Sequence, residues 1–344
     1  MIKNYIKTHI RKSGTYRALE IGKNRIENQF NDLKKQHDDL ENQYNDLKKE
    51  NTHLSRRLQG KEDEEENLHS LIQSLKSENN SLKRAFLNNN QTIQDYNNLT
   101  VIIPYRKTND LQREENVEIT LNYLSKLGIK NVIISEHSDF SFKSDLINDY
   151  RSLFDSFDVI FNNSHEKGFN KAIAINNGVM HSNTPYICIY DMDCVSEKKN
   201  MAKSLELLDE GFEIVYPFNR RIKDIEDKNE FKKSYNFNID SSEQNRDWAD
   251  GGIVFWNKQS FIHIGMLNEY FSGWGGEDNE IIIRGNLFKL KQIRLDEILY
   301  HLYHERPLIR SENNKEQLKK IRHMNQKDVL NEIKKWPWVI EAQK

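Results

Sequence analysis

The sequence predicts an α/β domain with a mostly parallel β-sheet, preceded by a long α-helical coiled coil. From residue 99 onward, short apolar runs alternate with segments of helical spacing, which is typical of a parallel sheet covered by helices on both faces. Over the first hundred residues, apolar side chains instead recur every seven positions. The mean hydropathy of −0.85 agrees, because a single compact globule of this length would be less polar.

Composition and charge restrict the classes of function. The chain carries 51 basic and 53 acidic residues, so its charge predicts no nucleic-acid partner. Its two cysteines, Cys188 and Cys194, form no disulfide framework, and no apolar run approaches the roughly 18 residues of a membrane span. The basic N-terminus lacks the apolar core of a signal peptide. We therefore expect a cytoplasmic protein, with peripheral contact at the inner face of the membrane as an option.

One heptad register predicts a coiled coil over residues 19–95. Asn51 and Asn79 occupy position a, where a buried asparagine pairs best with its own copy. This favours a parallel homodimer; a trimer and a single solvated helix are the alternatives. Lys61 interrupts position d, whose other members are all apolar: Leu19, Ile26, Leu33, Leu40, Leu47, Leu54, Leu68, Leu75 and Leu82.

Residues 1–18 form a basic segment ahead of the coiled coil. Ile2, Ile6 and Ile10 share one helical face, and the segment contains five basic residues and no acid in its first 17 positions. We interpret it as an amphipathic helix that contacts an anionic membrane surface, with an ordinary solvated helix start as the alternative. Liposome flotation with residues 1–17 deleted tests this, and unchanged binding would refute it.

The α/β domain is expected to span residues 99–308, followed by a helical extension over 309–344 that packs on it. Helices are expected at 116–128 and 167–182. The expected strands are 99–106, 131–137, 158–162, 186–194, 213–218 and 251–256.

Two aspartates follow one of these strands. Asp191 and Asp193 emerge at the carboxyl end of the run 186–194, the edge at which parallel sheets bind ligands. Two carboxylates directed at one cleft favour a hard divalent cation bridged to phosphates, Mn²⁺ or Mg²⁺. His301 and His304 have the donor type that suits Mn²⁺, but in one strand they would face opposite sides, so joint ligation requires a bend. A solvated turn and buried structural histidines are the alternatives.

The stretch "FSGWGGEDNEIIIRG" at residues 271–285 combines glycines, aromatic residues and clustered acids. Adjacent carboxylates repel and glycine loses entropy on folding, so such a cluster is more typical of a site than of a scaffold. An acidic helix N-terminus that leads into Ile281 is the structural interpretation, and both can hold.

Six blocks in chain order resemble the β-1,4-galactosyltransferase family. Residues 273–280 and 301–304 are also similar to bacterial chondroitin-type polymerases and polypeptide N-acetylgalactosaminyltransferases. The resemblance covers about residues 100–308. It implies a GT-A (Rossmann-like) fold and a metal-dependent glycosyltransferase with a UDP-sugar donor and a glycan acceptor. The blocks are "TVIIPYR" (100–106), "GFNKAIAINNGV" (168–179), "YDMD" (190–193), "GGIVFWNKQSF" (251–261), "GWGGEDNE" (273–280) and "HLYH" (301–304).

The resemblance also implies roles for individual residues. Asp278 is the expected general base of an inverting transfer, and Glu277 is the expected sugar anchor. The expected metal ligands are Asp193, His304 and His301, the last standing where the galactosyltransferases have a methionine. Residues expected at the UDP-sugar are Pro104, Tyr105, Arg106, Glu136, Phe169, Asn170, Lys171, Asp191, Gly252 and Trp274.

The small Ala249, just before Gly251 and Gly252, predicts room for an N-acetyl group on the donor sugar. We expect a role in bacterial surface polysaccharide synthesis. A retaining transferase of the same fold, a nucleotidyltransferase and an inactive coiled-coil scaffold are the alternatives.

Overall fold

The computed structural model describes residues 2–4, 6–7, 14–89, 95–165, 168–238, 249–273, 275–305 and 312–342, without the side chains of 15, 16, 38, 56–89 and 312. The chain divides into two compact units, 1–92 and 93–344. Trp274 lies outside the described residues, as does the whole stretch 8–13 in the predicted amphipathic segment. In the described part of the chain, no helix has both the length and the apolarity that crossing a membrane requires.

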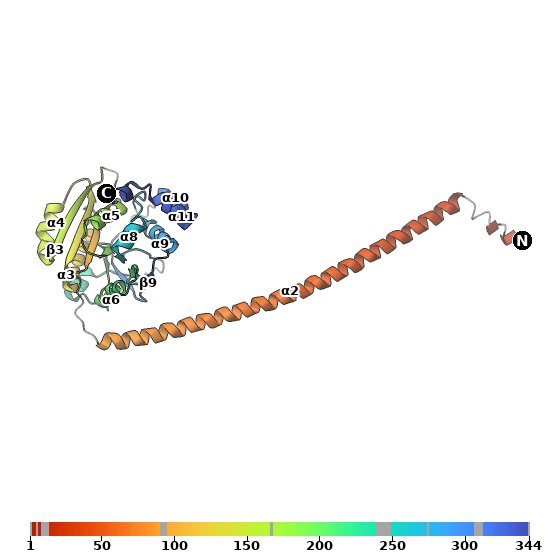
Figure 1. The fold of residues 1–344 in the computed structure, drawn as a ribbon, viewed down its shortest axis with the longest axis horizontal. Coiled ribbons are helices and arrows are strands. Elements are labelled where there is room, and N and C mark those ends of the chain that lie inside the picture. The colour runs from red at the N-terminus through yellow and green to blue at the C-terminus, as the bar shows by residue number, and fades with distance from the viewer. Residues whose placement is uncertain are drawn as a thin grey trace. The chain divides into compact units, whose positions relative to one another are not determined.

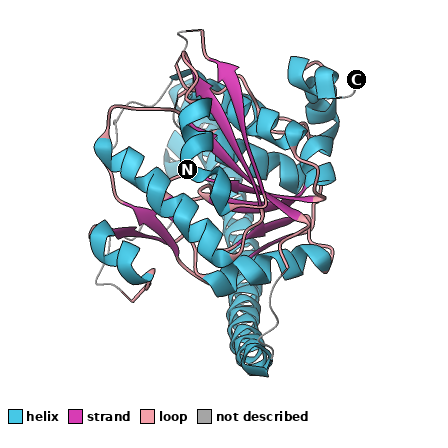
Figure 2. Ribbon diagram, turned by 90° about the vertical axis from the view of Figure 1, so that its left-hand side faces the viewer, coloured by secondary structure: helices cyan, strands magenta, loops and turns pink. Residues whose placement is uncertain are grey.

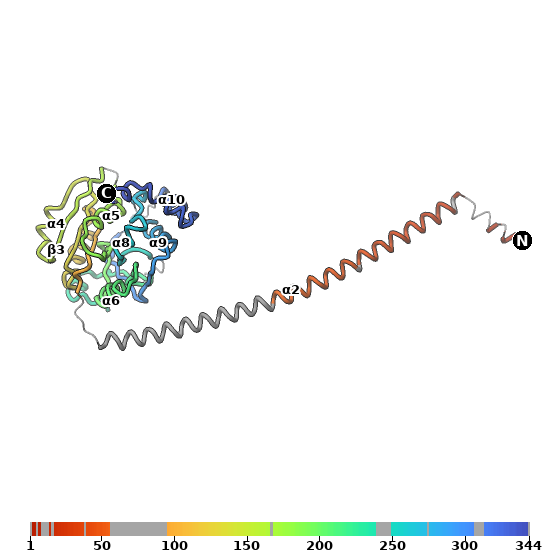
Figure 3. The backbone as a smooth tube through the Cα atoms, in the orientation of Figure 1, coloured from red at the N-terminus to blue at the C-terminus, as the bar shows by residue number. Residues whose placement is uncertain are grey.

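The first unit contains one long helix, α2 (Gly14–Asn89), whose bounds include Gly60 and Lys61. Figures 1 and 3 show the coloured N-terminal part of this helix as one continuous coil. Its d-position side chains up to residue 54 are 53% to 70% exposed. The helix therefore presents an apolar seam to solvent, and its pairing with a second copy stays a prediction.

The second unit is built on a seven-stranded sheet in the order β3-β2-β1-β4-β8-β6-β9. Figure 2 shows the strands of this unit between layers of helices. All neighbours pair in parallel except β8, which is antiparallel to both β4 and β6. The predicted mostly parallel sheet is confirmed. The strands are β1 (Leu99–Tyr105), β2 (Asn131–Ser138), β3 (Ser156–Asn163), β4 (Tyr186–Tyr190), β6 (Ile214–Tyr216), β8 (Ile253–Asn257) and β9 (Gln292–Arg294).

Helices cover both faces of this sheet, and side chains alternate between them. Val101 and Ile103 of β1 face the core formed with α3 (Leu111–Leu127), α4 (Lys143–Tyr150) and α6 (Lys198–Asp209). Ile187 and Ile189 of β4 face the opposite core, formed with α5 (Lys171–His181), α8 (Lys258–His263) and α9 (Glu277–Leu287). Continued by two residues, that alternation directs Asp191 to the side of α5 and α9.

A second, three-stranded sheet has the order β5-β10-β7, formed by β5 (Cys194–Val195), β7 (Ile222–Ile225) and β10 (Leu299–Leu302). The sequence predicted one strand over 186–194, but the chain leaves the large sheet after Tyr190 and enters the small sheet at Cys194. The two aspartates therefore lie in the turn between the sheets. A chain that changes sheets must bend, so Asp193 no longer follows the side-chain alternation of β4.

The remaining described elements are η1 (Arg151–Leu153), α7 (Lys228–Ser234), α10 (Glu312–Arg322), α11 (Gln326–Ile333) and α12 (Pro337–Ala342). Helices α11 and α12 form a small core around Val329, Ile333 and Trp336. Leu287 and Phe288 at the end of α9 also pack against this core. Trp338 donates from Nε1 to the Gly265 carbonyl, 3.1 Å away. The C-terminal helices thus pack on the α/β unit.

Candidate active site

The turn that holds Asp191 and Asp193 is fixed by backbone hydrogen bonds to three other segments. The Asp191 amide donates to Gly252 O at 2.7 Å, and the Leu302 amide donates to Asp193 O at 2.7 Å. Thr120 Oγ1 donates to Met192 O at 2.8 Å. Because β8 is antiparallel to β4, its first residues lie at the same edge as the carboxyl end of β4. The topology therefore joins the 251–252 and 191–193 segments at one edge.

Asp193, His301 and His304 form a group of donors suited to a metal ion. Their ligand atoms lie within 4.8 Å of one another. Asp193 Oδ2 is 2.8 Å from His304 Nε2 and 3.5 Å from His301 Nε2. Strand β10 ends at Leu302, so the chain bends between the two histidines and both rings reach the same carboxylate. This is the bend that joint ligation requires.

The second nitrogen of each ring already has a partner, which orients the first. His301 Nδ1 lies 2.7 Å from Asp224 Oδ1, and His304 Nδ1 lies 2.8 Å from the Glu305 carbonyl. Such outer partners are typical of metal-binding histidines, because they fix the ring and its tautomer. Burial raises the pKa of Asp193, but hydrogen bonds from both histidines outweigh it and hold the pKa well below the usual range. A carboxylate with two imidazoles fits Mn²⁺ better than Mg²⁺.

The acidic stretch at 277–280 begins helix α9. Gly276, at φ +104°, ends the loop in a left-handed conformation that favours glycine, and Glu277 and Asp278 enter the first helical turn. Asn314 of α10 braces the loop: its Nδ2 donates to Ser272 O at 3.0 Å and to Gly275 O at 2.8 Å. The helix-start interpretation is thus correct, and it coexists with a cluster of charged groups.

Lys171, at the start of α5, lies among three carboxylates of the site. Its Nζ is 2.9 Å from Asp191 Oδ2, 3.5 Å from Asp278 Oδ2 and 4.0 Å from Glu277 Oε1. Burial alone would lower the pKa of Lys171, but the three acids raise it well above its usual value. Burial raises the pKa of Asp191 to about 6 against the opposing effect of Lys171. Burial and the neighbouring Asp278 raise the pKa of Glu277 to about 7.

Gly251 is the residue that makes room for Asp278. A Cβ atom at Gly251 would lie 1.9 Å from Asp278 Oδ2, so any other residue would displace that carboxylate. The next residue, Gly252, has φ +112°, and a Cβ there would meet Leu299 Cδ2 at 2.6 Å and Cys194 Sγ at 3.3 Å. Of the two glycines, only Gly252 was expected at the UDP-sugar; the Gly-Gly pair was the signal available for its neighbour.

The raised pKa of Glu277 predicts how stability depends on pH. Between the ordinary value of 4.5 and about 7, the folded chain holds a proton on Glu277 that the unfolded chain has released. Stability therefore falls as pH rises through this window. Relative to wild type, Glu277→Gln should gain on the order of 1–3 kcal/mol in unfolding free energy between pH 4.5 and 7.5. Urea denaturation of the metal-free protein measures this. The exposed Glu226→Gln is the matched control, and a pH-independent difference for Glu277→Gln contradicts the prediction.

Other residues expected at the nucleotide lie around this centre. Pro104 and Tyr105 are buried at the end of β1, and Arg106 is exposed just after it. Glu136 is fully buried at the end of β2, where it accepts from the Phe142 amide at 3.0 Å. Burial raises the pKa of Glu136 despite these hydrogen bonds. Register pairs Tyr105 with Glu136, so both belong to the same edge.

Phe169 and Asn170 precede α5. The ring of Phe169 meets His137 edge-on at 6.1 Å between centroids. Asn170 caps α5 through the Ile173 amide, and its Nδ2 donates to the carbonyls of Glu269 and Phe271 at 2.9 and 2.8 Å. The Asn170 amide group therefore holds the 269–271 loop against α5. No sequence pattern indicates the three supporting residues Asp224, Asn314 and Thr120, because their partners are distant along the chain.

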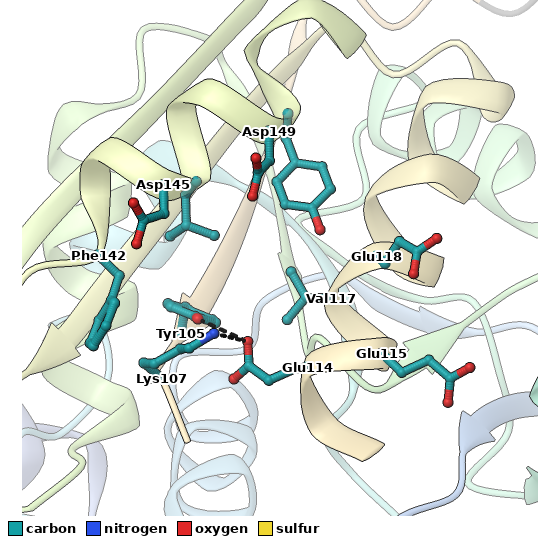
Figure 4. Close-up of a pocket in the computed structure, with 11 residues that line it drawn as sticks. Tyr105, Lys107, Glu114, Glu115, Val117, Glu118, Phe142, Asp145 and Asp149 are labelled. Atoms are coloured by element: carbon teal, nitrogen blue, oxygen red, sulfur yellow. Dashed lines mark hydrogen bonds and ion pairs between the residues drawn. The ribbon is translucent and has the colours of Figure 1, made fainter. Parts of the chain in front are cut away.

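A separate pocket of about 320 Å³ lies between α3 and α4, next to Tyr105 (Figure 4). Lys107 Nζ, 2.6 Å from Glu114 Oε2, is a basic group at its wall. Neither the metal triad nor Lys171 lines it. Its acidic lining would repel a diphosphate: Glu114, Glu115, Glu118, Asp145 and Asp149.

An α/β unit with a mostly parallel sheet and an Asp-x-Asp turn at its carboxyl edge defines a sugar transferase of the GT-A type. The model of glycosyl transferase family 2 matches residues 100–271, half of the chain, so the chain belongs to that family. A model described as the N-terminal domain of galactosyltransferase matches residues 240–305.

Solved structures of similar proteins can be compared with the chain. The catalytic domain of Drosophila β1,4-galactosyltransferase 7, in complex with xylobiose, is 17% identical, with 66% of this chain and 81% of that chain covered and a TM-score of 0.41. S. aureus TarS in complex with UDP-GlcNAc is 14% identical, with 68% and 71% covered and a TM-score of 0.45. No curated protein matches the chain in sequence.

Proposed function

We propose that this glycosyltransferase moves a hexose or N-acetylhexosamine from a UDP-sugar to a hydroxyl of a glycan acceptor, with inversion at the anomeric carbon and with Mn²⁺ or Mg²⁺ as cofactor. One observation carries the proposal: the donors Asp193, His301 and His304 adjoin the carboxylates around Lys171 at one sheet edge. A role in bacterial surface polysaccharide synthesis is part of the proposal. A bound cation would offset the charge that develops on the leaving diphosphate.

The chain's own residues supply the remaining chemistry. Asp278 takes the proton of the acceptor hydroxyl as that oxygen bonds to the anomeric carbon and the bond to the diphosphate breaks. Lys171 keeps three mutually repelling acids together at the site. Asp191 Oδ1 and Glu277 Oε2 are buried and accept no hydrogen bond from the described residues, so hydroxyls of ribose and sugar suit them as donors.

The proposal is tested by incubating the full chain with a panel of UDP-sugars and Mn²⁺, with and without EDTA. Release of UDP that EDTA abolishes supports it. Release of pyrophosphate from a nucleoside triphosphate would instead support the nucleotidyltransferase, and no turnover with any donor would support the inactive scaffold. Polarimetry or NMR of the product anomer separates inverting from retaining transfer.

The donor is expected to carry an N-acetyl group. Ala249 is only partly buried and packs at the edge of the core, just before Gly251. We expect a larger side chain at this position to compete with an N-acetyl group beside Gly251 and Gly252. Ala249→Phe should therefore lower turnover of UDP-N-acetylhexosamine relative to UDP-hexose about tenfold or more. Turnover ratios across the donor panel measure this, and a strict wild-type preference for UDP-galactose contradicts it.

We also propose that α2 pairs with a second copy into a parallel homodimer. Leu33 and Leu40 are 64% and 65% exposed in the single chain, and burying each leucine stabilises by about 1.5–3 kcal/mol. Replacing both by aspartate should give monomers in size-exclusion chromatography with light scattering. The matched control replaces Lys35 and Asn42 by aspartate, at position f of the same heptads, and should keep the dimer. A wild-type monomer contradicts the proposal, whereas a wild-type trimer changes its stoichiometry.

A further inference from the structure

A cluster of arginines that the proposed mechanism does not use lies next to Asp278. Arg220 Nε and Arg294 Nη2 both donate to Asp250 Oδ1, each over 2.8 Å. The other oxygen of Asp250 accepts from Asn279 Nδ2 at 2.7 Å. Asn279 directly follows Asp278 in helix α9. Asp250 therefore ties two guanidinium groups to the helix start that carries the proposed base.

The segment 250–252 shows on which side of the base the arginines lie. Asp250 contacts the arginines, Gly251 contacts the Asp278 carboxylate, and Gly252 lies against Cys194, next to the metal ligand Asp193. Along this segment, the base thus stands between the arginine cluster and the metal triad. In the proposed reaction the diphosphate belongs on the side of the metal triad, so the arginine cluster belongs on the side of the acceptor.

The arginine cluster has more positive than negative charge and can therefore bind an anion. Asp250 is 11% exposed and already accepts three hydrogen bonds, which leaves it little capacity for more. The Arg220 side chain is 47% exposed, and in the part of the chain that the structure describes its two terminal nitrogens bond to no residue. One carboxylate neutralises one of two guanidinium groups, so the pair keeps a positive charge beside an open fork.

The backbone at Arg220 is strained. Its φ of +76° lies in the left-handed region, which a residue with a Cβ atom adopts at a penalty of roughly 1–2 kcal/mol. Glycine would remove the strain, so the turn between β6 and β7 holds a guanidinium group here at the expense of backbone stability. Such outliers concentrate at ligand sites, where the position of the side chain matters more than local stability.

A buried aromatic platform supports the second arginine. Arg294 Cζ lies 3.6 Å from the ring centroid of Tyr216, which is 2% exposed. Arg294 Nη1 and Tyr216 Oη are both buried, and no described residue bonds to either. Unpaired buried polar atoms are rare and each calls for an explanation. Here they lie beside Asp250 and are available to a network that a ligand completes.

We propose that Arg220 and Arg294 form a subsite for an oxyanion of the acceptor, a carboxylate of a hexuronic acid or a phosphate group. The inference rests on the proposed function and specifies its acceptor class. A planar guanidinium matches both oxyanions through paired N–H donors, whereas a neutral sugar ring has no group that needs two arginines. Arg220 can hold the anion with its terminal nitrogens while Nε stays on Asp250.

The experiment compares acceptor oligosaccharides that differ in one terminal group: glucose, glucuronic acid or glucose 6-phosphate. With the full chain, Mn²⁺ and the best donor, wild type should prefer one charged acceptor over the neutral one in kcat/KM by about tenfold to a hundredfold. The preferred arm identifies the carboxylate or the phosphate. Arg220→Gln should reduce the preference to near one through KM, and Arg220→Lys should restore part of it, because lysine keeps the charge and loses the fork.

Arg221→Gln is the matched control. Arg221 is 43% exposed and bonds to Asn219 and Asp296 instead of Asp250, so its loss should keep the preference. The subsite is overturned if wild type uses neutral and charged acceptors equally, or if Arg220→Gln keeps the preference of wild type. In either case, transfer to neutral acceptors leaves the proposed function intact. Absence of transfer from every donor to every acceptor removes the proposed function and the subsite with it.

Discussion

Replacing Asp278 by asparagine is expected to lower kcat about 10²- to 10⁴-fold, because this is the range that a positioned general base contributes. Asparagine has the same shape and accepts no proton. It also fits the space that Gly251 leaves, where a Cβ atom would lie only 1.9 Å from Asp278 Oδ2. The donor should still bind, since its proposed contacts lie on the metal side, so KM for the UDP-sugar should change little. Steady-state UDP release measures both constants.

The matched control for this variant is Asp145→Asn, which removes a carboxylate from the separate acidic pocket and should leave kcat unchanged. Thermal melting checks that Asp278→Asn remains folded. A decrease in kcat of less than tenfold, with the fold intact, would show that another group takes the proton. Glu277, whose pKa of about 7 lies near neutral pH, is then the next candidate for the base.

Replacing Asp193 by alanine is expected to abolish Mn²⁺ binding and, with it, sugar transfer. The variant removes the one carboxylate of the triad and leaves two imidazoles, a weaker set for a hard divalent ion. Even outer-shell changes weaken metal binding about 10- to 100-fold, so the loss of a direct ligand should exceed that. Electron paramagnetic resonance of added Mn²⁺ reads the binding without depending on activity.

A graded variant accompanies this one. Asp224→Asn keeps a hydrogen-bonding side chain next to His301 Nδ1 and removes its charge, and we expect Mn²⁺ affinity about 10- to 100-fold below wild type. Affinity should also fall as pH drops, because protons compete for imidazole and carboxylate. Mn²⁺ binding by Asp193→Ala as tight as that of wild type would contradict the triad as the metal site.

Local patterns in the sequence were enough to predict several features. Strand and helix alternation predicted the parallel sheet, because burial on both faces requires continuous apolar runs. The predicted ligand trio Asp193, His301 and His304 is brought together by the fold. The strand predicted over 186–194 was too long, because the chain leaves the large sheet after Tyr190 and enters the small sheet at Cys194. The apolar pattern of the sequence is the same for a strand in either sheet, so it does not indicate this change.

Supporting contacts escaped prediction because they join residues far apart along the chain. Asn314 lies in a charged tail without a motif, yet it holds the loop that leads to Gly276. Asp224 orients His301 from 77 residues away. Arg220, Arg294 and Asn279 come from three separate segments, and their convergence on Asp250 depends on the order of the strands.

The sequence by itself determined most strands of the large sheet, the apolar heptad seam and the identity of the chemical groups, because periodicity and residue type are local properties. Only the tertiary structure decided which groups meet. The antiparallel direction of β8 brings Gly251 to Asp278, and the crossing from β4 to β5 brings Asp193 to both histidines. Strand direction and sheet order depend on how distant segments pack, and no short pattern encodes them.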